Sequence, residues 1–206
     1  MIAIIDYGMG NLGSVQKAIE SVGGDARIVG TLSELARAEK IVLPGVAAFG
    51  DAMDQLRARG LVEPIVKAIA EGTPYLGFCL GLQLLFDISY EDGEHTGLGV
   101  FAGKVVRFHF DPALESPRLK IPHIGWNQIH WGKPVPLLAG IDSGAHVYFD
   151  HSYHVVPIDS ELSATTTEYG YRFTSAVWRD NVFATQFHPE KSQSVGLKLL
   201  ENFVNL

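Results

Sequence analysis

Short apolar segments alternate with helical patterns along the first half of the chain, and this alternation restricts the possible folds most strongly. Segments of four or five mostly apolar residues predict strands over 2–6, 26–29, 40–43 and 74–78. Helical patterns are predicted over 11–22, 48–59, 62–71 and 80–88. Apolar strands separated by helices are typical of a parallel sheet that is covered on both faces. We expect an α/β fold with an open, mostly parallel, doubly wound sheet.

The second half has shorter strand candidates separated by turn residues. They cover 104–108, 127–131, 146–149, 163–167, 175–178 and 183–187, and an amphipathic helix is predicted over 192–204. The last three strand candidates predict an antiparallel extension of the sheet. Residues 91–99 and 111–122 are expected to form loops. Because no linker is evident, we expect one domain over residues 1–206.

Composition excludes several classes of function. The net charge is −7 and the 16 basic residues are scattered, which argues against a nucleic-acid surface. No apolar run reaches the roughly 18 residues that span a bilayer, and the first residues lack the basic segment of a signal peptide. The chain has one cysteine, which suits a reducing compartment. We therefore expect a soluble, cytoplasmic protein that binds neither nucleic acid nor membrane.

The single cysteine, Cys79, lies where a predicted strand turns into a predicted helix. Gly77 and Gly81 flank it, and such glycines allow the sharp turn of a nucleophile elbow, which exposes a reactive side chain above a sheet. A helix N-terminus also lowers a thiol pKa, because its free N–H groups and dipole favour the thiolate. We predict that Cys79 is a nucleophile.

A thiolate nucleophile needs a proton shuttle, and His188 is the best candidate. It ends an apolar strand and is followed by Pro189, which favours an extended neighbour. Residues i and i+2 of an extended chain point the same way, so Glu190 is predicted to orient the His188 ring. For a tetrahedral oxyanion, we expect donors from the Leu80 N–H and from the strand-end loop that contains Val46.

Two other patterns are given structural interpretations. Residues 8–13 match G-x-G-x-x-G after a strand, but the second strand lacks the acidic residue that a dinucleotide site requires. We interpret this segment as a tight turn. His151 and His154 are spaced i and i+3 in a strand-like stretch, so they are expected to face opposite sides, and no metal site is predicted.

Taken together, G-x-C-x-G after a strand, a late H-P-E and an upstream P-G-V resemble class I (triad-type) glutamine amidotransferases over the whole chain. Segments 6–12, 122–127, 148–153 and 186–192 more specifically resemble the glutaminase subunits of imidazole glycerol phosphate synthases. The resemblance implies that Cys79, His188 and Glu190 hydrolyse glutamine through a thioester, without a cofactor. It places the glutamine near Gly45, Gln83, Ser152 and Tyr153.

The resemblance also implies a heterodimer with a (β/α)₈ cyclase subunit that uses the ammonia. Nearly the whole chain serves the glutaminase module, so the acceptor site is expected on that second protein. Asn11, Trp126 and Lys191 are the positions predicted at the interface. An alternative is a paralogous amidotransferase subunit for another acceptor, such as a surface sugar. A cysteine hydrolase or peptidase and a non-catalytic regulatory subunit are further alternatives.

One position departs from the resemblance. The family usually has P-G-V-G, whereas this chain has Ala47 in the fourth position. A peptide flip in this loop is thought to complete the oxyanion hole of such subunits when the partner is bound. Alanine pays about 1 kcal/mol or more at positive φ, whereas glycine does not. We hypothesise that Ala47 shifts the balance between the states of this loop.

Overall fold

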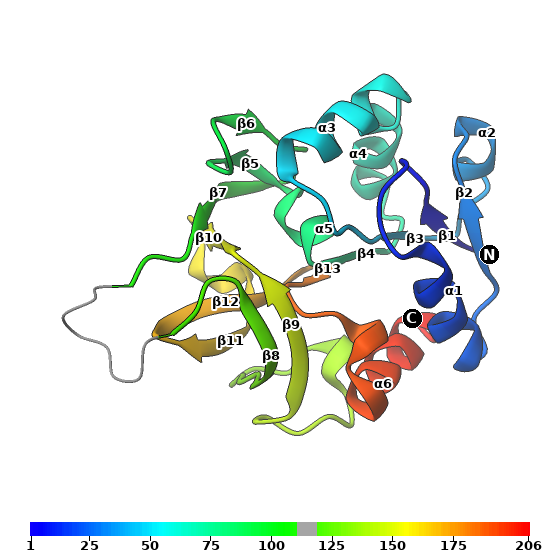
Figure 1. The fold of residues 1–206 in the computed structure, drawn as a ribbon. Coiled ribbons are helices and arrows are strands. Elements are labelled where there is room, and N and C mark those ends of the chain that lie inside the picture. The colour runs from blue at the N-terminus through cyan, green and yellow to red at the C-terminus, as the bar shows by residue number, and fades with distance from the viewer. Residues whose placement is uncertain (111–118) are drawn as a thin grey trace.

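A seven-stranded sheet forms the centre of the molecule (Figure 1). The computed structural model describes residues 1–110 and 119–206 of the chain. The strand order is β11-β12-β13-β4-β3-β1-β2. The strands are β1 (Ile2–Ile5), β2 (Ala26–Val29), β3 (Lys40–Leu43), β4 (Tyr75–Phe78), β11 (Ser163–Tyr169), β12 (Tyr171–Arg179) and β13 (Val182–Thr185). The five strands β13, β4, β3, β1 and β2 pair in parallel, in that order across the sheet. Strands β12 and β11 extend this sheet by antiparallel pairing next to β13. Both features confirm the predicted architecture.

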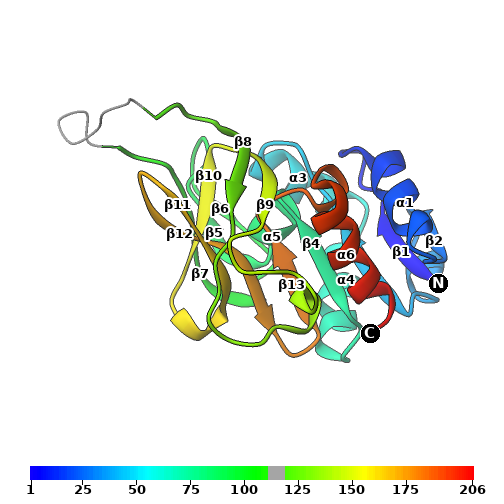
Figure 2. The same ribbon diagram turned by 90° about the horizontal axis from the view of Figure 1, so that it is seen from below.

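Helices cover both faces of this sheet, as Figures 1 and 2 show. On one face are α1 (Leu12–Ser21) and α6 (Gln193–Val204); on the other are α3 (Phe49–Ala58) and α4 (Val62–Ala70). A short helix, α2 (Leu32–Leu35), follows β2. Side chains of β1 alternate between the two cores: Ile2 and Ile4 pack with α1 and α6, and Ala3 and Ile5 with α3 and α4. Burial on both faces explains the continuous apolar strand sequences.

Smaller sheets lie beside the central one and carry part of the site. One has the order β10-β7-β5-β6, and the other is an antiparallel ribbon of β8 and β9. Their strands are β5 (Phe86–Ser89), β6 (His95–Thr96), β7 (Phe101–Arg107), β8 (His123–Gln128), β9 (His146–His151) and β10 (Tyr153–Pro157). Single 3₁₀ turns are η1 (Pro136–Leu138), η2 (Ser160–Leu162) and η3 (Pro189–Lys191).

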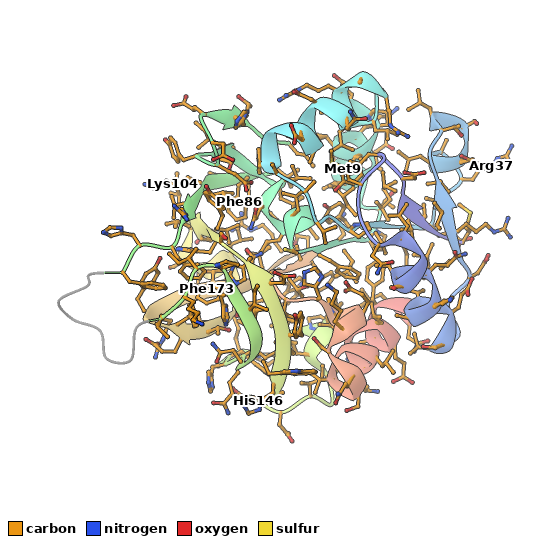
Figure 3. The ribbon with its side chains drawn as sticks, in the orientation of Figure 1. Met9, Arg37, Phe86, Lys104, His146 and Phe173 are labelled. Carbon is orange, nitrogen blue, oxygen red and sulfur yellow. The ribbon has the colours of Figure 1, made fainter. Side chains whose placement is uncertain are left out.

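The helix predicted over 80–88 is wrong in its second half. Helix α5 (Leu80–Gln83) is one turn long, and the chain then enters β5, where Figure 3 labels Phe86. The Leu84 carbonyl accepts from the Leu98 N–H at 2.8 Å, and the Leu85 carbonyl accepts from Val100 and Phe101 at 2.9 Å. A distant segment thus takes the hydrogen bonds that would have continued the helix. An apolar run alone does not distinguish a buried helix from a buried strand.

Other differences concern strand limits. The strand predicted over 127–131 lies earlier, at β8, and β10 and the two-residue β6 were not predicted as strands. The eight residues at 111–118 of the predicted 111–122 loop lie outside the described residues. Across the described ranges, no helix has the length and apolar character needed to cross a membrane.

Candidate functional site

Cys79 occupies a strained turn between β4 and α5. Its φ of 51° is in the left-handed region, which non-glycine residues rarely adopt. The Cys79 N–H donates to the Thr185 carbonyl of β13 at 2.7 Å, which ties the turn to the centre of the sheet. The N–H groups of Leu82 and Gln83 donate to the Cys79 carbonyl and are the first donors within the helix. The Leu80 N–H comes before them in the chain and is therefore not used by the helix.

The neighbouring glycines are required by close packing. A Cβ atom on Gly81 would lie 1.9 Å from the Leu43 carbonyl oxygen, and one on Gly77 would lie 2.4 Å from the Gly81 carbonyl oxygen. The Tyr75 hydroxyl donates to that same Gly81 carbonyl at 2.8 Å. Strand β4, helix α5 and the end of β3 therefore approach one another at backbone contact, which holds the elbow in place.

The Cys79 sulfur faces two polar groups from other elements. The Gln186 Nε2 donates to Sγ at 3.5 Å, and Sγ lies 3.8 Å from the Asp150 carbonyl oxygen in β9. The cysteine is 7% exposed and lines a cavity. The sulfur is thus accessible to a small molecule and is not enclosed by apolar side chains.

His188 and Glu190 form a buried pair beside the thiol. The His188 Nδ1 lies 2.8 Å from the Glu190 Oε1, and both side chains are almost completely buried. His188 is extended, but Pro189 begins the 3₁₀ turn η3, so the two side chains meet across this turn and not along a continued strand. The His188 Nε2 has no hydrogen-bond partner among the described residues, which leaves it free for the reacting groups.

The electrostatics of the pair favour a protonated imidazole. Burial alone lowers the pKa of His188, because it penalises the charged ring. The interaction with the nearby Cys79, and the hydrogen bond and charge of Glu190, act in the opposite direction and outweigh burial, so the pKa of His188 rises to about 10. An imidazolium between a sulfur and a carboxylate is the arrangement of a thiolate–imidazolium pair.

A cavity of about 280 Å³ opens over the thiol and brings together most of the residues singled out from sequence. Its lining consists of Gly45, Val46, Ala47, Cys79, Leu80, Gln83, Glu91, Pro122, Asp150, His151, Ser152 and Tyr153. The predicted oxyanion residues and substrate residues all belong to this lining. They follow β3 and β4 of the central sheet and β9 of the adjoining ribbon. The site therefore lies at the carboxyl ends of β3 and β4, where open α/β sheets generally place it.

A hydrogen bond from the buried Tyr7 holds the loop after β3 in place. The buried Tyr7 hydroxyl donates to the Pro44 carbonyl at 3.0 Å. A Cβ atom on Gly45 would lie 2.5 Å from that hydroxyl and 2.8 Å from the Leu80 Cβ, so only glycine fits. Burial, followed by the charge of Cys79, raises the pKa of Tyr7 well above its ordinary value, which keeps the hydroxyl a donor.

The Gln83 side chain is held by hydrogen bonds within the protein. It lies one turn after Cys79, but its Nε2 donates to the Tyr153 carbonyl at 3.1 Å and to the Gln186 Oε1 at 3.2 Å. Both amide protons are therefore used within the protein. Only the amide oxygen remains to contact a ligand, so Gln83 offers an acceptor and not a donor.

Two residues of the site were missed by sequence reasoning. Glu91, expected in a plain loop, lines the cavity and accepts from the Phe49 N–H at the start of α3 at 2.8 Å. Burial raises the pKa of Glu91, and the nearby Asp92 and Asp51 add to this effect. Gln186 contacts the sulfur. Its position at the end of a strand, two residues before His188, was the sequence signal that could have identified Gln186 as a site residue.

The three predicted interface residues lie outside the cavity, on exposed surface. Asn11 caps α1, where its Oδ1 accepts from the Ser14 N–H at 3.4 Å. Trp126 of β8 is 46% exposed and packs edge-on against Tyr148 of β9. The Lys191 Nζ lies 5.7 Å from the centre of the same Tyr148 ring. Trp126, Tyr148 and Lys191 thus form one exposed cluster, here called the Tyr148 cluster.

The loop over residues 8–11 is a tight turn, as interpreted from sequence, whereas Leu12 and Gly13 already belong to α1. Gly8 and Gly10 have φ values of 89° and 106°, and Met9, labelled in Figure 3, packs against the core. A Cβ atom on Gly10 would lie 3.8 Å from the Pro44 carbonyl oxygen, so this turn borders the loop after β3.

His151 and His154 do not face opposite sides, contrary to the prediction from their spacing. Both rings pack against Phe108, at centroid distances of 5.2 Å and 4.8 Å, and therefore lie on one side. The reason is that Ser152 separates β9 from β10, so the two histidines do not share one strand. His151 bonds to His123 and the Tyr153 carbonyl, and His154 to the Tyr171 hydroxyl and the Val155 carbonyl.

Comparison with known proteins identifies the family of this chain. The family model described as "Glutamine amidotransferase class-I" matches residues 3–206. A relative from Syntrophotalea carbinolica, named imidazole glycerol phosphate synthase subunit HisH, is 58% identical over 98% of both chains. A protein of the same name from Aquifex aeolicus is 53% identical over 97% of this chain and 94% of its own.

Solved structures share the fold at lower identity. A crystal structure described as a glutamine amidotransferase superposes with a TM-score of 0.75 at 17% identity, and covers all of both chains. PurLQS from Thermotoga maritima gives 0.75 at 20% identity, covering 99% of this chain and 97% of that one. The chain belongs to the class I glutamine amidotransferase family, and within it to the group of imidazole glycerol phosphate synthase HisH subunits.

Proposed function

We propose that this chain is the glutaminase subunit of an imidazole glycerol phosphate synthase and that residues 1–206 act as one glutaminase domain. The observation that carries the proposal is the position of Cys79, which lines a small cavity next to the buried His188–Glu190 pair. No cofactor is needed for amide hydrolysis by such a triad.

In the first half of the reaction, the Cys79 thiolate attacks the side-chain amide carbon of glutamine. A C–S bond forms and the carbonyl oxygen becomes an oxyanion, which the Leu80 and Val46 N–H groups are proposed to receive. His188 then gives its proton to the amide nitrogen, the C–N bond breaks, and ammonia leaves a thioester. Glu190 holds the ring in the tautomer that presents Nε2 to the reacting atoms.

In the second half, water attacks the thioester carbon while His188 accepts its proton. The C–S bond breaks, glutamate leaves, and the thiolate is restored with its imidazolium partner. The raised pKa of His188 suits the first half, because the ring holds a proton that it can give to the leaving nitrogen.

Glu190→Gln is expected to lower the pKa of His188 and to reduce glutamine hydrolysis at least about a hundredfold. The variant removes the charge that stabilises the imidazolium, so the fall in activity with rising pH moves to lower pH. Glutamate release measured against pH, with NMR titration of the His188 ring, checks both effects. The matched control is Glu201→Gln on the surface of α6. An unchanged His188 pKa would contradict the assigned role of Glu190.

Specificity for glutamine is proposed to come from both ends of the substrate. Glu91 supplies a carboxylate for the α-ammonium group, and the Gln83 oxygen accepts from an N–H of the substrate. Gly45 lines the cavity at a position where Tyr7 and Leu80 leave no space for a side chain, and Ser152 and Tyr153 line it from the end of β9.

Glu91→Gln is expected to raise the KM for glutamine about ten- to a hundredfold while kcat changes less. Loss of a charge-assisted hydrogen bond removes binding that is equal in the ground and transition states. Steady-state glutamate release checks the split between KM and kcat, with Glu94→Gln in the neighbouring exposed loop as control. A fall in kcat alone would place Glu91 outside the substrate contact.

The ammonia acceptor is proposed to lie on a (β/α)₈ cyclase subunit that docks over the cavity. Ammonia released into water near neutral pH is mostly protonated and no longer nucleophilic, so a docked partner is needed to receive it. The Tyr148 cluster and Asn11 are the proposed contacts. The Tyr148 carbonyl accepts from the His188 N–H at 2.9 Å, so this surface is one hydrogen bond from the catalytic histidine.

A coupled assay tests the proposed function. Glutamate release is measured for this chain alone, with the histidine-pathway cyclase, and with the cyclase and its nucleotide. The expected result is strong stimulation by the partner and the appearance of imidazole glycerol phosphate. Stimulation only by another acceptor synthase would favour the paralogous subunit. Full turnover without any partner would favour a free cysteine hydrolase.

Ala47→Gly is expected to raise the partner-free glutaminase rate up to about fivefold, the equivalent of roughly 1 kcal/mol. Ala47 has a φ outside the left-handed region here, so glycine relieves no strain in this state and lowers only the cost of a flipped loop. Ala48→Gly, where φ is −67° at the start of α3, is the control. Rates are compared with and without the partner, and identical rates in both states would discard the hypothesis.

A further inference from the structure

Gln186 is a buried polar residue that the mechanism above does not use. It follows β13, which pairs in parallel with β4, and it has no exposed surface. Its backbone N–H donates to the Ser175 carbonyl at 2.8 Å, so the neighbouring strand fixes its position. Its side chain reaches the end of β4, where its Nε2 lies 3.5 Å from the Cys79 sulfur.

The orientation of the Gln186 amide is dictated by a backbone carbonyl. The Tyr153 carbonyl only accepts hydrogen bonds, so the Gln83 side chain must turn its NH₂ group toward it. The second proton of that NH₂ group then faces Gln186, which must present its oxygen. The Gln186 NH₂ group is left pointing at the sulfur. Reversing either amide would bring two donors or two acceptors together at about 3 Å.

A second contact strengthens this anchor. His151 donates from Nδ1 to the same Tyr153 carbonyl at 2.7 Å, and its Nε2 accepts from the His123 Nδ1 at 3.0 Å. Burial lowers the pKa of His151, so the ring stays neutral and keeps this pattern of donors and acceptors. The carbonyl that orients Gln83 is therefore itself held in place.

We propose that Gln186 is a further catalytic residue, whose side-chain amide donates a hydrogen bond to the Cys79 sulfur and stabilises the thiolate. The inference rests on the proposed function only in taking Cys79 as the nucleophile. An N–H donor interacts more strongly with an anionic sulfur than with a neutral one. The Asp150 carbonyl, 3.8 Å from the same sulfur, acts oppositely, because it favours the S–H form.

The Cys79 thiol is thus balanced between groups from several elements. His188, just before η3, favours the thiolate, and Glu190 within η3 does so through its hydrogen bond to His188. Gln186 favours the thiolate from the end of β13. Tyr7, which follows β1, and the cavity-lining residues Glu91, Asp150, His151 and Tyr153 are further titratable groups near it. Removing the Gln186 donor leaves these groups in place, so its effect can be measured separately.

The pH dependence of alkylation by iodoacetamide tests the proposal. Cys79 is the only cysteine, so the rate reports its thiolate fraction without turnover, glutamine or partner. Gln186→Met keeps the length and removes the donor; the midpoint is expected to rise by about one pH unit, and alkylation at pH values below the midpoint is expected to be about tenfold slower. Gln186→Glu, which places a negative charge beside the sulfur, should raise the midpoint further.

Controls separate this role from a structural one. Gln128→Met, an exposed glutamine on β8, should leave the midpoint unchanged. A structural role for Gln186 would change the melting temperature but not the midpoint, and an unchanged midpoint in both Gln186 variants overturns the proposal. Because the assay needs no glutaminase activity, failure of the proposed function would leave this result interpretable.

A measurement on the parent chain covers the case in which the variants do not fold. In ¹⁵N-labelled protein, the NMR signal of the Gln186 side-chain amide proton is expected to move downfield as the Cys79 thiol ionises. The midpoint of this shift should equal the midpoint measured by alkylation. In Cys79→Ala this titration should disappear. A Gln186 amide signal that is insensitive to the ionisation of Cys79 would equally overturn the proposal.

Discussion

Replacing Cys79 by alanine is expected to abolish glutamine hydrolysis, with a loss of at least about a thousandfold, because no other group can form the thioester. Glutamate release is measured with the cyclase partner present. The fold should persist, because the strained φ of 51° depends on the backbone contacts of the elbow and not on the sulfur.

An external supply of ammonium provides the control for this variant. The Cys79→Ala complex should still form imidazole glycerol phosphate when ammonium salts replace glutamine, because the acceptor site is proposed to lie on the partner. Loss of both activities would indicate that the complex no longer assembles. Retained glutamine hydrolysis would refute the assignment of the nucleophile, and a chain that is inactive before the substitution would favour the non-catalytic alternative.

Gly81→Ala is expected to destabilise the protein by about 2 to 4 kcal/mol and to remove most of its activity. The new Cβ atom would lie 1.9 Å from the Leu43 carbonyl oxygen, so α5 must move away from β3. That movement separates Cys79 and Leu80 from the loop at Gly45. Urea unfolding, with glutamate release measured on the folded fraction, checks both effects.

Gly13→Ala is the matched control, since it makes the same chemical change in α1, where no atom lies within 4 Å of the added Cβ. There the substitution should stabilise the chain by about 0.5 to 1 kcal/mol, because alanine is the better helix residue. If Gly81→Ala unfolded at the same urea concentration as the parent, the close approach at the elbow would not be a requirement of the fold.

The sequence predicted the central sheet well because its strands are buried on both faces. Residues 40–43 coincide with β3, where Ile41, Val42 and Leu43 are buried, and this apolar run needs no tertiary information to be recognised. Residues 26–29 also coincide with β2, although Arg27 and Ile28 of this edge strand are exposed. The antiparallel end was also predictable, since turn residues separate its strands. The run after Cys79 was not, because its continuation as β5 depends on hydrogen bonds from residues 98–101.

For the site, the chemistry of each residue was encoded locally, whereas the partners of each residue were not. Flanking glycines and a strand end single out Cys79 and His188 from the chain alone. Only the tertiary structure determines that the Gln83 amide donates to Tyr153 and Gln186, and that Glu91 lines the cavity. Local sequence sets backbone preferences and reactive groups, but which donor meets which acceptor depends on segments brought together only when the sheets pack.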